Sequence, residues 1–243
     1  MKVSKTDFVD FLQKISLKGL IQEVVIEENG MVATVPQSKE HNQDCTIFGT
    51  FDGLGIKARI GLGDVALLAK IVGSLETADN LVNIDLQDKS LIIAARNGKY
   101  QYRLADPDVI TSIKDSYPAA CTLMQSFEGL ELSLSGIVNL KKAISNLMSD
   151  RVSMYAHDGV LEAVVHDDGT KSSATIELGA SKKNFKNDYD ASLLSKVLDT
   201  VDSDGTLLFV QEPKDEKPQP IFIQLKSKKF LYMVSPFVEV KTE

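Results

Sequence analysis

One pattern repeats four times along this chain: a short strand, an amphipathic helix and three further strands. Phe8, Phe11 and Ile15 show why the first helix is predicted, because they follow the i, i+3, i+7 spacing of a helix with one apolar face. The four helices are expected at residues 4–17, 64–72, 138–148 and 192–201. Apolar or alternating segments separated by turn pairs predict the strands. These are expected at residues 2–3, 21–27, 30–35, 44–51, 56–60, 81–86, 90–95, 100–104, 127–135, 151–156, 160–166, 173–178, 185–190, 206–211, 221–225 and 230–234.

A repeat of this kind constrains the architecture. Each unit has an apolar helix face and an apolar sheet face, and it can bury neither of them alone. Two fused units give a domain with two helices packed on curved antiparallel sheets, and the chain is long enough for two such domains. We therefore predict an α+β fold with domain one at residues 1–105, an extended connector at 106–126 and domain two at 127–243. An irregular α+β protein with accidental repeats is the alternative.

Charge and cysteine content narrow the class of protein. The formal net charge of −7 argues against a protein that coats nucleic acid with its whole surface, although a local basic surface is still compatible with it. Cys45 and Cys121 are far apart in sequence and are expected to be reduced thiols. We expect no secretory leader and no membrane span. The expected location is the cytoplasm of a bacterium or a phage-infected host cell, or the nucleus if the host is eukaryotic.

Two stretches carry a resemblance to a known family. Pro220-Ile-Phe-Ile-Gln-Leu and then Phe230-Leu-Tyr-Met-Val-Ser-Pro-Phe form a strand after proline, a hairpin and an aromatic strand closed by Ser-Pro. Residues 133–148 run from a strand through Ser-Gly into a helix. With the fourfold pattern, these stretches resemble the DNA sliding clamps, the family of proliferating cell nuclear antigen and the shorter clamps of T4-like phages. The longer loop at residues 212–219 and a less basic first helix favour a phage or viral clamp.

The resemblance implies a function without catalysis and without a cofactor. Three chains of two domains would close into a homotrimeric ring around duplex DNA, independently of DNA sequence, and would tether DNA polymerase as a processivity factor. A clamp loader and other replication proteins are further implied partners. Two other hypotheses stay open: a non-ring accessory DNA-binding protein of clamp-like fold, and an unrelated α+β enzyme.

In the family, the helices line the hole of the ring, so their polar faces should meet the DNA. Lysine and arginine neutralise phosphates without reading the base sequence, and such contacts exchange easily, as sliding requires. Aspartates on the same helices, among them Asp7 and Asp199, would dilute the positive field. The candidate DNA-channel residues are Lys5, Lys14, Lys70, Lys141, Lys142 and Lys196 on the helices and Arg59, Arg151, Lys182, Lys183 and Lys186 near them.

Two further sites follow from the resemblance. Clamps join by strand addition between the last strand of domain one and an edge strand of domain two, which leaves no free sheet edge. The expected interface residues are Tyr100, Tyr102, Leu104, Ala174, Ile176 and Leu178. Partner peptides insert apolar residues into a pocket between the connector and the C-terminal strands. The expected pocket residues are Leu123, Met124, Pro220, Ile221, Met233, Ser235 and Pro236.

The sequence gives little support to catalysis. No nucleophile-elbow, zinc-protease or phosphate-loop motif occurs. The histidines are His41, His157 and His166. His166 precedes two aspartates, but Asp168-Gly169 is a typical turn, so we expect no metal site. A binding protein is therefore the better hypothesis.

Overall fold

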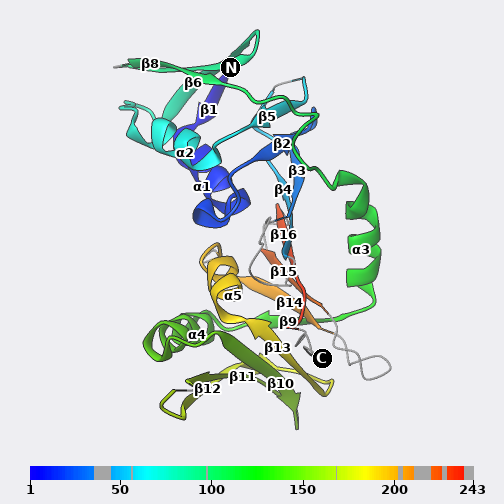
Figure 1. The fold of residues 1–243 in the computed structure, drawn as a ribbon. Coiled ribbons are helices and arrows are strands. Elements are labelled where there is room, and N and C mark those ends of the chain that lie inside the picture. The colour runs from blue at the N-terminus through cyan, green and yellow to red at the C-terminus, as the bar shows by residue number, and fades with distance from the viewer. Residues whose placement is uncertain are drawn as a thin grey trace, which may run out of the picture. The chain divides into compact units, whose positions relative to one another are not determined.

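The structure is a computed structural model that describes residues 1–35, 45–55, 57–96, 98–167, 169–201, 205–210, 220–225 and 229–237 (Figure 1). Within these residues the chain forms five α-helices and antiparallel sheets, so the predicted α+β class is confirmed. The chain divides into two compact units. Unit 1 comprises Met1–Gln37 and Ile47–Tyr117, and unit 2 comprises Ser38–Thr46 and Pro118–Glu243.

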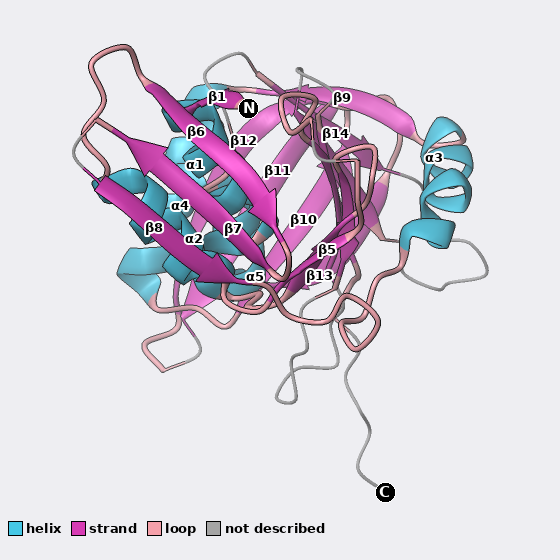
Figure 2. Ribbon diagram, turned by 90° about the horizontal axis from the view of Figure 1, so that it is seen from above, coloured by secondary structure: helices cyan, strands magenta, loops and turns pink. Residues whose placement is uncertain are grey.

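Unit 1 consists of two helices and a set of short strands. In chain order these are β1 (Lys2–Ser4), α1 (Lys5–Ile15), the 3-10 helix η1 (Leu17–Gly19), β2 (Val24–Ile26), β3 (Met31–Thr34), β4 (Cys45–Thr50), β5 (Ile60–Leu62), α2 (Val65–Ser74), β6 (Leu81–Gln87), β7 (Ser90–Ala95), β8 (Gly98–Arg103) and η2 (Lys114–Ser116). One antiparallel sheet has the order β1-β6-β7-β8, and Figure 2 shows its strands lying over α1 and α2. β2 pairs with β5, and β3 pairs with β4.

A side-chain cap and an aromatic cluster position α1. Ser4 Oγ accepts a hydrogen bond from the Asp7 N–H at 3.3 Å, which satisfies one of the unpaired donors at the helix start. Phe8 and Phe11 project into the core from the buried face of α1. Their ring centroids lie 5.5 and 5.1 Å from that of Phe51. The apolar spacing of the sequence therefore becomes the core of unit 1.

Unit 2 contains the remaining helices and strands. These are α3 (Tyr117–Gln125, whose first residue belongs to unit 1), β9 (Glu128–Leu132), α4 (Leu134–Leu147), β10 (Arg151–His157), β11 (Val160–Asp167), β12 (Ser172–Ala180), β13 (Phe185–Asp190), α5 (Ala191–Leu198), β14 (Thr206–Val210), β15 (Ile221–Leu225) and β16 (Phe230–Val234). One sheet has the order β12-β11-β10-β13, and β16-β15-β14-β9 follow one another in a second.

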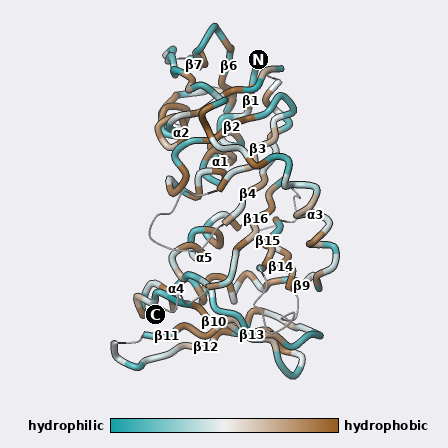
Figure 3. Tube along the Cα trace, turned by 45° about the vertical axis from the view of Figure 1, so that its right-hand side comes forward, coloured by the Kyte–Doolittle hydropathy of each residue, from teal (hydrophilic) through white to brown (hydrophobic). Residues whose placement is uncertain are grey.

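Two helices of unit 2, α4 and α5, cover one face of the first of these sheets. α4 packs on β11 and β12, and α5 packs on β10 and β13. Val152, Met154 and Ala163 are at most 1% exposed and form part of this core, while the intervening residues point to the other face. Hydrophobic residues, brown in Figure 3, accordingly recur along the strands.

Helix α4 begins earlier than the sequence pattern indicated. Leu134 continues the alternation of Leu130 and Leu132, so residues 127–135 were expected to form one strand; β9 instead ends at Leu132. The reason is a cap, because Ser133 Oγ accepts a hydrogen bond from the Gly136 N–H at 3.0 Å. The strand expectation is therefore wrong for residues 134–135.

The connector is helical where an extended chain was expected. Residues 117–125 form α3, preceded by η2. Pro118 lies in the first turn of α3, where its missing N–H leaves no hydrogen bond unmade. The proline that suggested an extended segment thus fits a helix start.

Candidate functional site

The exposed face of α1 is not basic. Lys14, expected on a DNA-facing surface, is only 5% exposed, and its Nζ lies 2.8 Å from Asp10 Oδ2, so the expectation of an exposed lysine is wrong. Lys5 Nζ donates to the Leu75 carbonyl at 2.7 Å. Asp7 and Asp10 remain exposed on this helix. The net charge that α1 presents to solvent is therefore low or negative.

The other helices offer a few more accessible lysines. Lys70 on α2 and Lys142 on α4 are exposed, and Lys196 on α5 is half-buried. None of the three forms an ion pair with the part of the chain that the structure describes. Lys141 on α4 pairs with Asp199 after α5, which joins these two helices. The predicted channel lysines thus differ in whether a carboxylate already neutralises their charge.

The two predicted arginines are engaged in ion pairs. Arg59 Nε lies 3.5 Å from Glu27 Oε1, and its Nη1 contacts Asp108. Arg151 Nη1 lies 3.5 Å from Asp188 Oδ2. Any contact of these guanidinium groups with phosphate would compete with the carboxylates that they already bind.

The loop and strand lysines of unit 2 lie between β12 and β13 or on β13. Lys182 and Lys183 follow β12, and the Lys182 N–H donates to Glu128 Oε1 at 3.0 Å. Lys186 Nζ lies 5.2 Å from the centroid of the Tyr155 ring, its cross-strand neighbour. Phe185 and its alternates face α5, so Lys186 points to the opposite side of the sheet. Lys186 therefore lies on the sheet face away from α5, and its contact with DNA stays a prediction.

The edge strands β8 and β12 carry the predicted interface residues, but several of those side chains are core residues. Tyr102 is 5% exposed, and its hydroxyl accepts from the Asp64 N–H at 2.8 Å; burial raises the pKa of this tyrosine. Ile176 and Leu178 are 9% and 1% exposed and face the helices of unit 2. Tyr100 is 44% exposed. What the edges offer a partner is backbone, not these buried side chains.

The remaining predicted interface residues are Leu104 and Ala174, both half-buried. Leu104 follows β8, and its N–H donates to the Lys89 carbonyl at 2.8 Å. Ala174 lies on β12 opposite Val165 and faces the helix side of its sheet. Both residues therefore lie on or directly after the edge strands, with side chains that are only partly exposed.

Apolar residues beside these edges were missed by the sequence patterns. Leu67 in the first turn of α2 is 47% exposed, and Leu134 and Val138 on α4 are 50% and 42% exposed. Leu134 and Val138 lie near the β12 edge because α4 packs along β12. Leu67 lies near the β8 edge because the Tyr102 hydroxyl on β8 donates a hydrogen bond to the carbonyl of Asp64, the N-cap of α2. The i, i+4 spacing of Leu134 and Val138 is the signal that could have found them.

The two edges also differ in charge. Lys99 and Arg103 are exposed on β8, on the face opposite Tyr100 and Tyr102. On β12, Glu177 is exposed and lies directly across from Glu162 of β11. Like charges in a direct cross-strand pair are destabilising unless a cation lies nearby. One edge is therefore basic and the other acidic.

The residues predicted to form the partner pocket in unit 2 include several on or beside β15 and β16. Met233 is half-buried opposite Phe222, and Pro220, Ser235 and Pro236 are half-buried at one end of the same two strands. Ile221 is 1% exposed and belongs to the core.

Helix α3 is tied to the sheet of β15 and β16 through Phe127. The Phe127 ring lies 5.2 Å from that of Phe222 in an edge-to-face arrangement, and the Phe127 N–H donates to the Met124 carbonyl at 3.0 Å. Leu123 on α3 is 41% exposed and Met124 is half-buried. The structure thus brings the end of α3 to the same sheet as the predicted pocket residues.

No metal-binding cluster of histidine, cysteine or acidic residues occurs in the described ranges. His157 Nε2 lies 3.3 Å from Glu162 Oε2 at the surface, and His166 is exposed. His41 and Asp168 lie outside the residues that the structure describes. Among the described helices, none is long and apolar enough to cross a bilayer.

Comparison with known proteins identifies the fold. No family model and no curated protein matches the sequence. The proliferating cell nuclear antigen of A. fulgidus, solved bound to the C-terminal region of FEN-1, superposes with a TM-score of 0.69 at 15% identity, over 99% of this chain and 98% of that one. The chain has the sliding-clamp fold. Proliferating cellular nuclear antigen of Entamoeba histolytica gives 0.67 at 14% identity, over 95% and 96%.

Bacterial sliding clamps are matched in part of their length. The DNA polymerase III beta chain of Streptococcus pneumoniae superposes with a TM-score of 0.70 at 12% identity. This match covers 98% of the present chain but 64% of the bacterial one. The chain therefore corresponds to a whole two-domain clamp and to about two thirds of the longer bacterial type.

Proposed function

We propose that the chain is a sliding clamp: a non-enzymatic subunit that closes into a homotrimeric ring around duplex DNA and tethers DNA polymerase. The observation that carries this proposal is the pair of complementary edges. Among the described residues, β8 and β12 each have one side without a strand partner. Each edge is flanked by exposed leucine, valine or tyrosine, and one is basic where the other is acidic.

Pairing of β8 with β12 of another copy would serve several groups at once. It would form hydrogen bonds to the unpaired N–H and C=O groups of both strands. Such groups promote aggregation when a sheet edge stays exposed. It would bring Lys99 and Arg103 toward Glu177, and it would cover Leu67, Leu134 and Val138. A contact between two different surfaces forms a ring when the rotation closes, and the family resemblance implies closure with three copies.

The helix lysines support DNA binding of moderate strength. Lys70, Lys142 and Lys196 can neutralise phosphate without displacing an ion-pair partner in the described chain. Lys5, Lys141, Arg59 and Arg151 are already bound to other groups. Weak, non-specific contacts suit a protein that must move along the duplex.

The face of β15 and β16 with α3 is the proposed site for polymerase, clamp loader and other replication proteins. The A. fulgidus neighbour was solved with a bound FEN-1 segment, which supports peptide binding by this fold. Met233, Met124 and Leu123 supply flexible apolar side chains, which suit a surface that accepts several partners.

Solution mass is the first test of the ring. Sedimentation equilibrium over a wide concentration range should give three times the chain mass of 26.6 kDa, with dissociation only on dilution. Retention on nicked circular duplex, with loss after linearisation, would then test encirclement. A strict monomer at high concentration would reject the homotrimer.

A further inference from the structure

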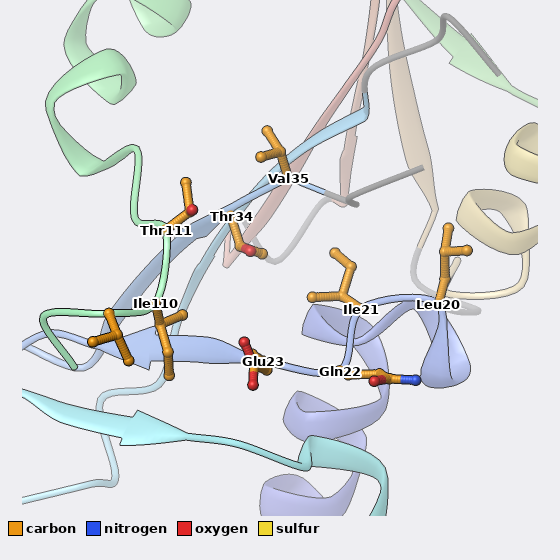
Figure 4. Close-up of a pocket in the computed structure, with 9 residues that line it drawn as sticks. Leu20, Ile21, Gln22, Glu23, Thr34, Val35, Ile110 and Thr111 are labelled. Atoms are coloured by element: carbon orange, nitrogen blue, oxygen red, sulfur yellow. The ribbon is translucent and has the colours of Figure 1, made fainter. Parts of the chain in front are cut away.

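A cavity of about 290 Å³ opens at the surface of unit 1. Three segments line it: Leu20–Glu23 after η1, Thr34 and Val35 at the end of β3, and Val109–Thr111 after β8. Figure 4 shows Ile110 and Thr111 across the space from Leu20 and Ile21. The volume is just below the ~300–1,000 Å³ of small-molecule pockets, so it suits a side chain better than a whole metabolite.

The wall formed by Val109–Thr111 is held at both ends. On one side, Asp108 pairs with Arg59. On the other, Lys114 Nζ and Ser112 Oγ each lie 3.3 Å from the carboxylate of Glu27, which is 9% exposed. Between these anchors Val109 is 78% exposed at the cavity rim. A fixed segment that presents an apolar side chain to solvent has the form of a docking wall.

The opposite wall offers unpaired backbone. On the side of β3 away from β4, the Met31 carbonyl accepts from the Glu27 N–H at 2.8 Å and the Ala33 carbonyl accepts from the Ile113 N–H at 3.1 Å. Alternation along the strand makes Val35 the next residue in this row. Within the described chain, no backbone hydrogen bond reaches Val35. An extended segment could therefore add to β3 at this point.

The charge of the lining selects the chemistry of the occupant. Glu23 is its one charged residue, is exposed, and has no ion pair in the part of the chain described. Arg59 and Lys114, the nearby cations, are bound to Glu27 and Asp108. In Figure 4 the Glu23 carboxylate lies between the Ile110 side and the Gln22 side of the cavity. Each of the three lining segments thus contributes aliphatic side chains, and the one charge of the lining is negative.

We propose that this cavity is a second docking site, which takes an extended segment of a partner protein carrying an aliphatic residue next to a basic one. The aliphatic side chain enters between Ile21, Val35 and Ile110, the basic side chain pairs with Glu23, and the segment's backbone extends β3. This site lies entirely in unit 1, so it depends neither on ring closure nor on the proposed pocket of unit 2.

Methyl NMR of the full chain tests this proposal directly. The probe is the blocked peptide Gly-Arg-Leu-Arg-Gly, compared with Gly-Glu-Leu-Glu-Gly. The basic peptide should shift the methyl signals of Ile21, Val35 and Ile110 saturably, and the acidic one should bind at least about tenfold more weakly. Absence of saturable shifts, or equal binding of both peptides, would overturn the proposal.

Three variants localise the effect. Glu23→Lys should weaken the basic peptide by about fivefold to tenfold, and Val109→Arg at the exposed rim should also weaken it. Glu28→Lys changes an exposed carboxylate outside the cavity by the same charge and should leave affinity unchanged. If Glu28→Lys had the same effect, binding would be diffuse attraction. Shifts of these methyls with protein concentration alone would assign the cavity to a second copy of the chain, against the proposal.

Discussion

At the residue scale, Gly136 shows how one position couples a helix to a sheet. A Cβ there would lie 2.6 Å from Ser133 Oγ and 2.7 Å from the Glu177 carbonyl oxygen. Glycine to alanine normally stabilises a helix, but here α4 or the β12 backbone would have to move. Gly136→Ala should therefore destabilise the fold by roughly 1–3 kcal/mol, measured by urea unfolding at fixed protein concentration.

Gly73 in α2 provides the control for this substitution. Its added Cβ would meet nothing within 4 Å, and its backbone is helical. Gly73→Ala should stabilise by about 0.5–1 kcal/mol through helix propensity. Equal and favourable effects of both substitutions would show that the close approach of α4 to β12 is absent in solution.

Tyr102 gives the chain a pH dependence at the alkaline end. Burial raises the pKa of its hydroxyl above the ordinary tyrosine value of 10.0, so the folded state favours the neutral phenol. The resulting stability is fully present below pH 10 and is lost as pH rises through the folded-state pKa. Tyr102→Phe should flatten this loss and cost about 1 kcal/mol at pH 7, since the Asp64 N–H loses its acceptor. Tyr100→Phe, at an exposed tyrosine, should change neither the free energy of unfolding at pH 7 nor its loss at alkaline pH.

At the element scale, sequence periodicity predicted the four large helices but not their surface chemistry. The spacing of Phe8, Phe11 and Ile15 requires only local information, because it reflects one helix face. The bonds that occupy Arg59 join residues far apart in sequence, Glu27 and Asp108, and no local pattern contains them. Similarly, the strand alternation through Leu134 concealed a helix start that a single serine cap decides.

The helix faces make a prediction about salt dependence. Lys70→Gln and Lys142→Gln should each lower the slope of log affinity for duplex DNA against log salt by about 0.9 per lost phosphate contact. Lys14→Gln should leave the slope unchanged, because Lys14 is buried against Asp10. Fluorescence anisotropy of a labelled duplex over a salt series measures all three. A slope that responds to Lys14 alone would contradict the assignment of accessible cations.

At the scale of the whole molecule, the distribution of charge is compatible with the DNA binding that we propose for a chain that is acidic overall. The net charge of −7 need not oppose binding if acidic groups gather at an edge such as that of Glu177 while a few lysines stay accessible on helices. In the proposed ring, the same arrangement would make assembly depend on opposite charges at two edges. Ring closure is therefore open to a test by charge exchange.

Exchange of the edge charges should first break the ring and then restore it. Glu177→Lys alone, or Lys99→Glu with Arg103→Glu, should raise the dissociation constant of the oligomer at least about tenfold, because each places like charges across the joint. All three changes in one chain should recover much of the loss. Asp85→Lys on β6, an equal charge change on an inner strand, should have no effect. Sedimentation equilibrium reports each mass. Loss without recovery in the triple variant would mean that Glu177 and the β8 cations do not meet, and the joint would have to be sought at other surfaces of the two units.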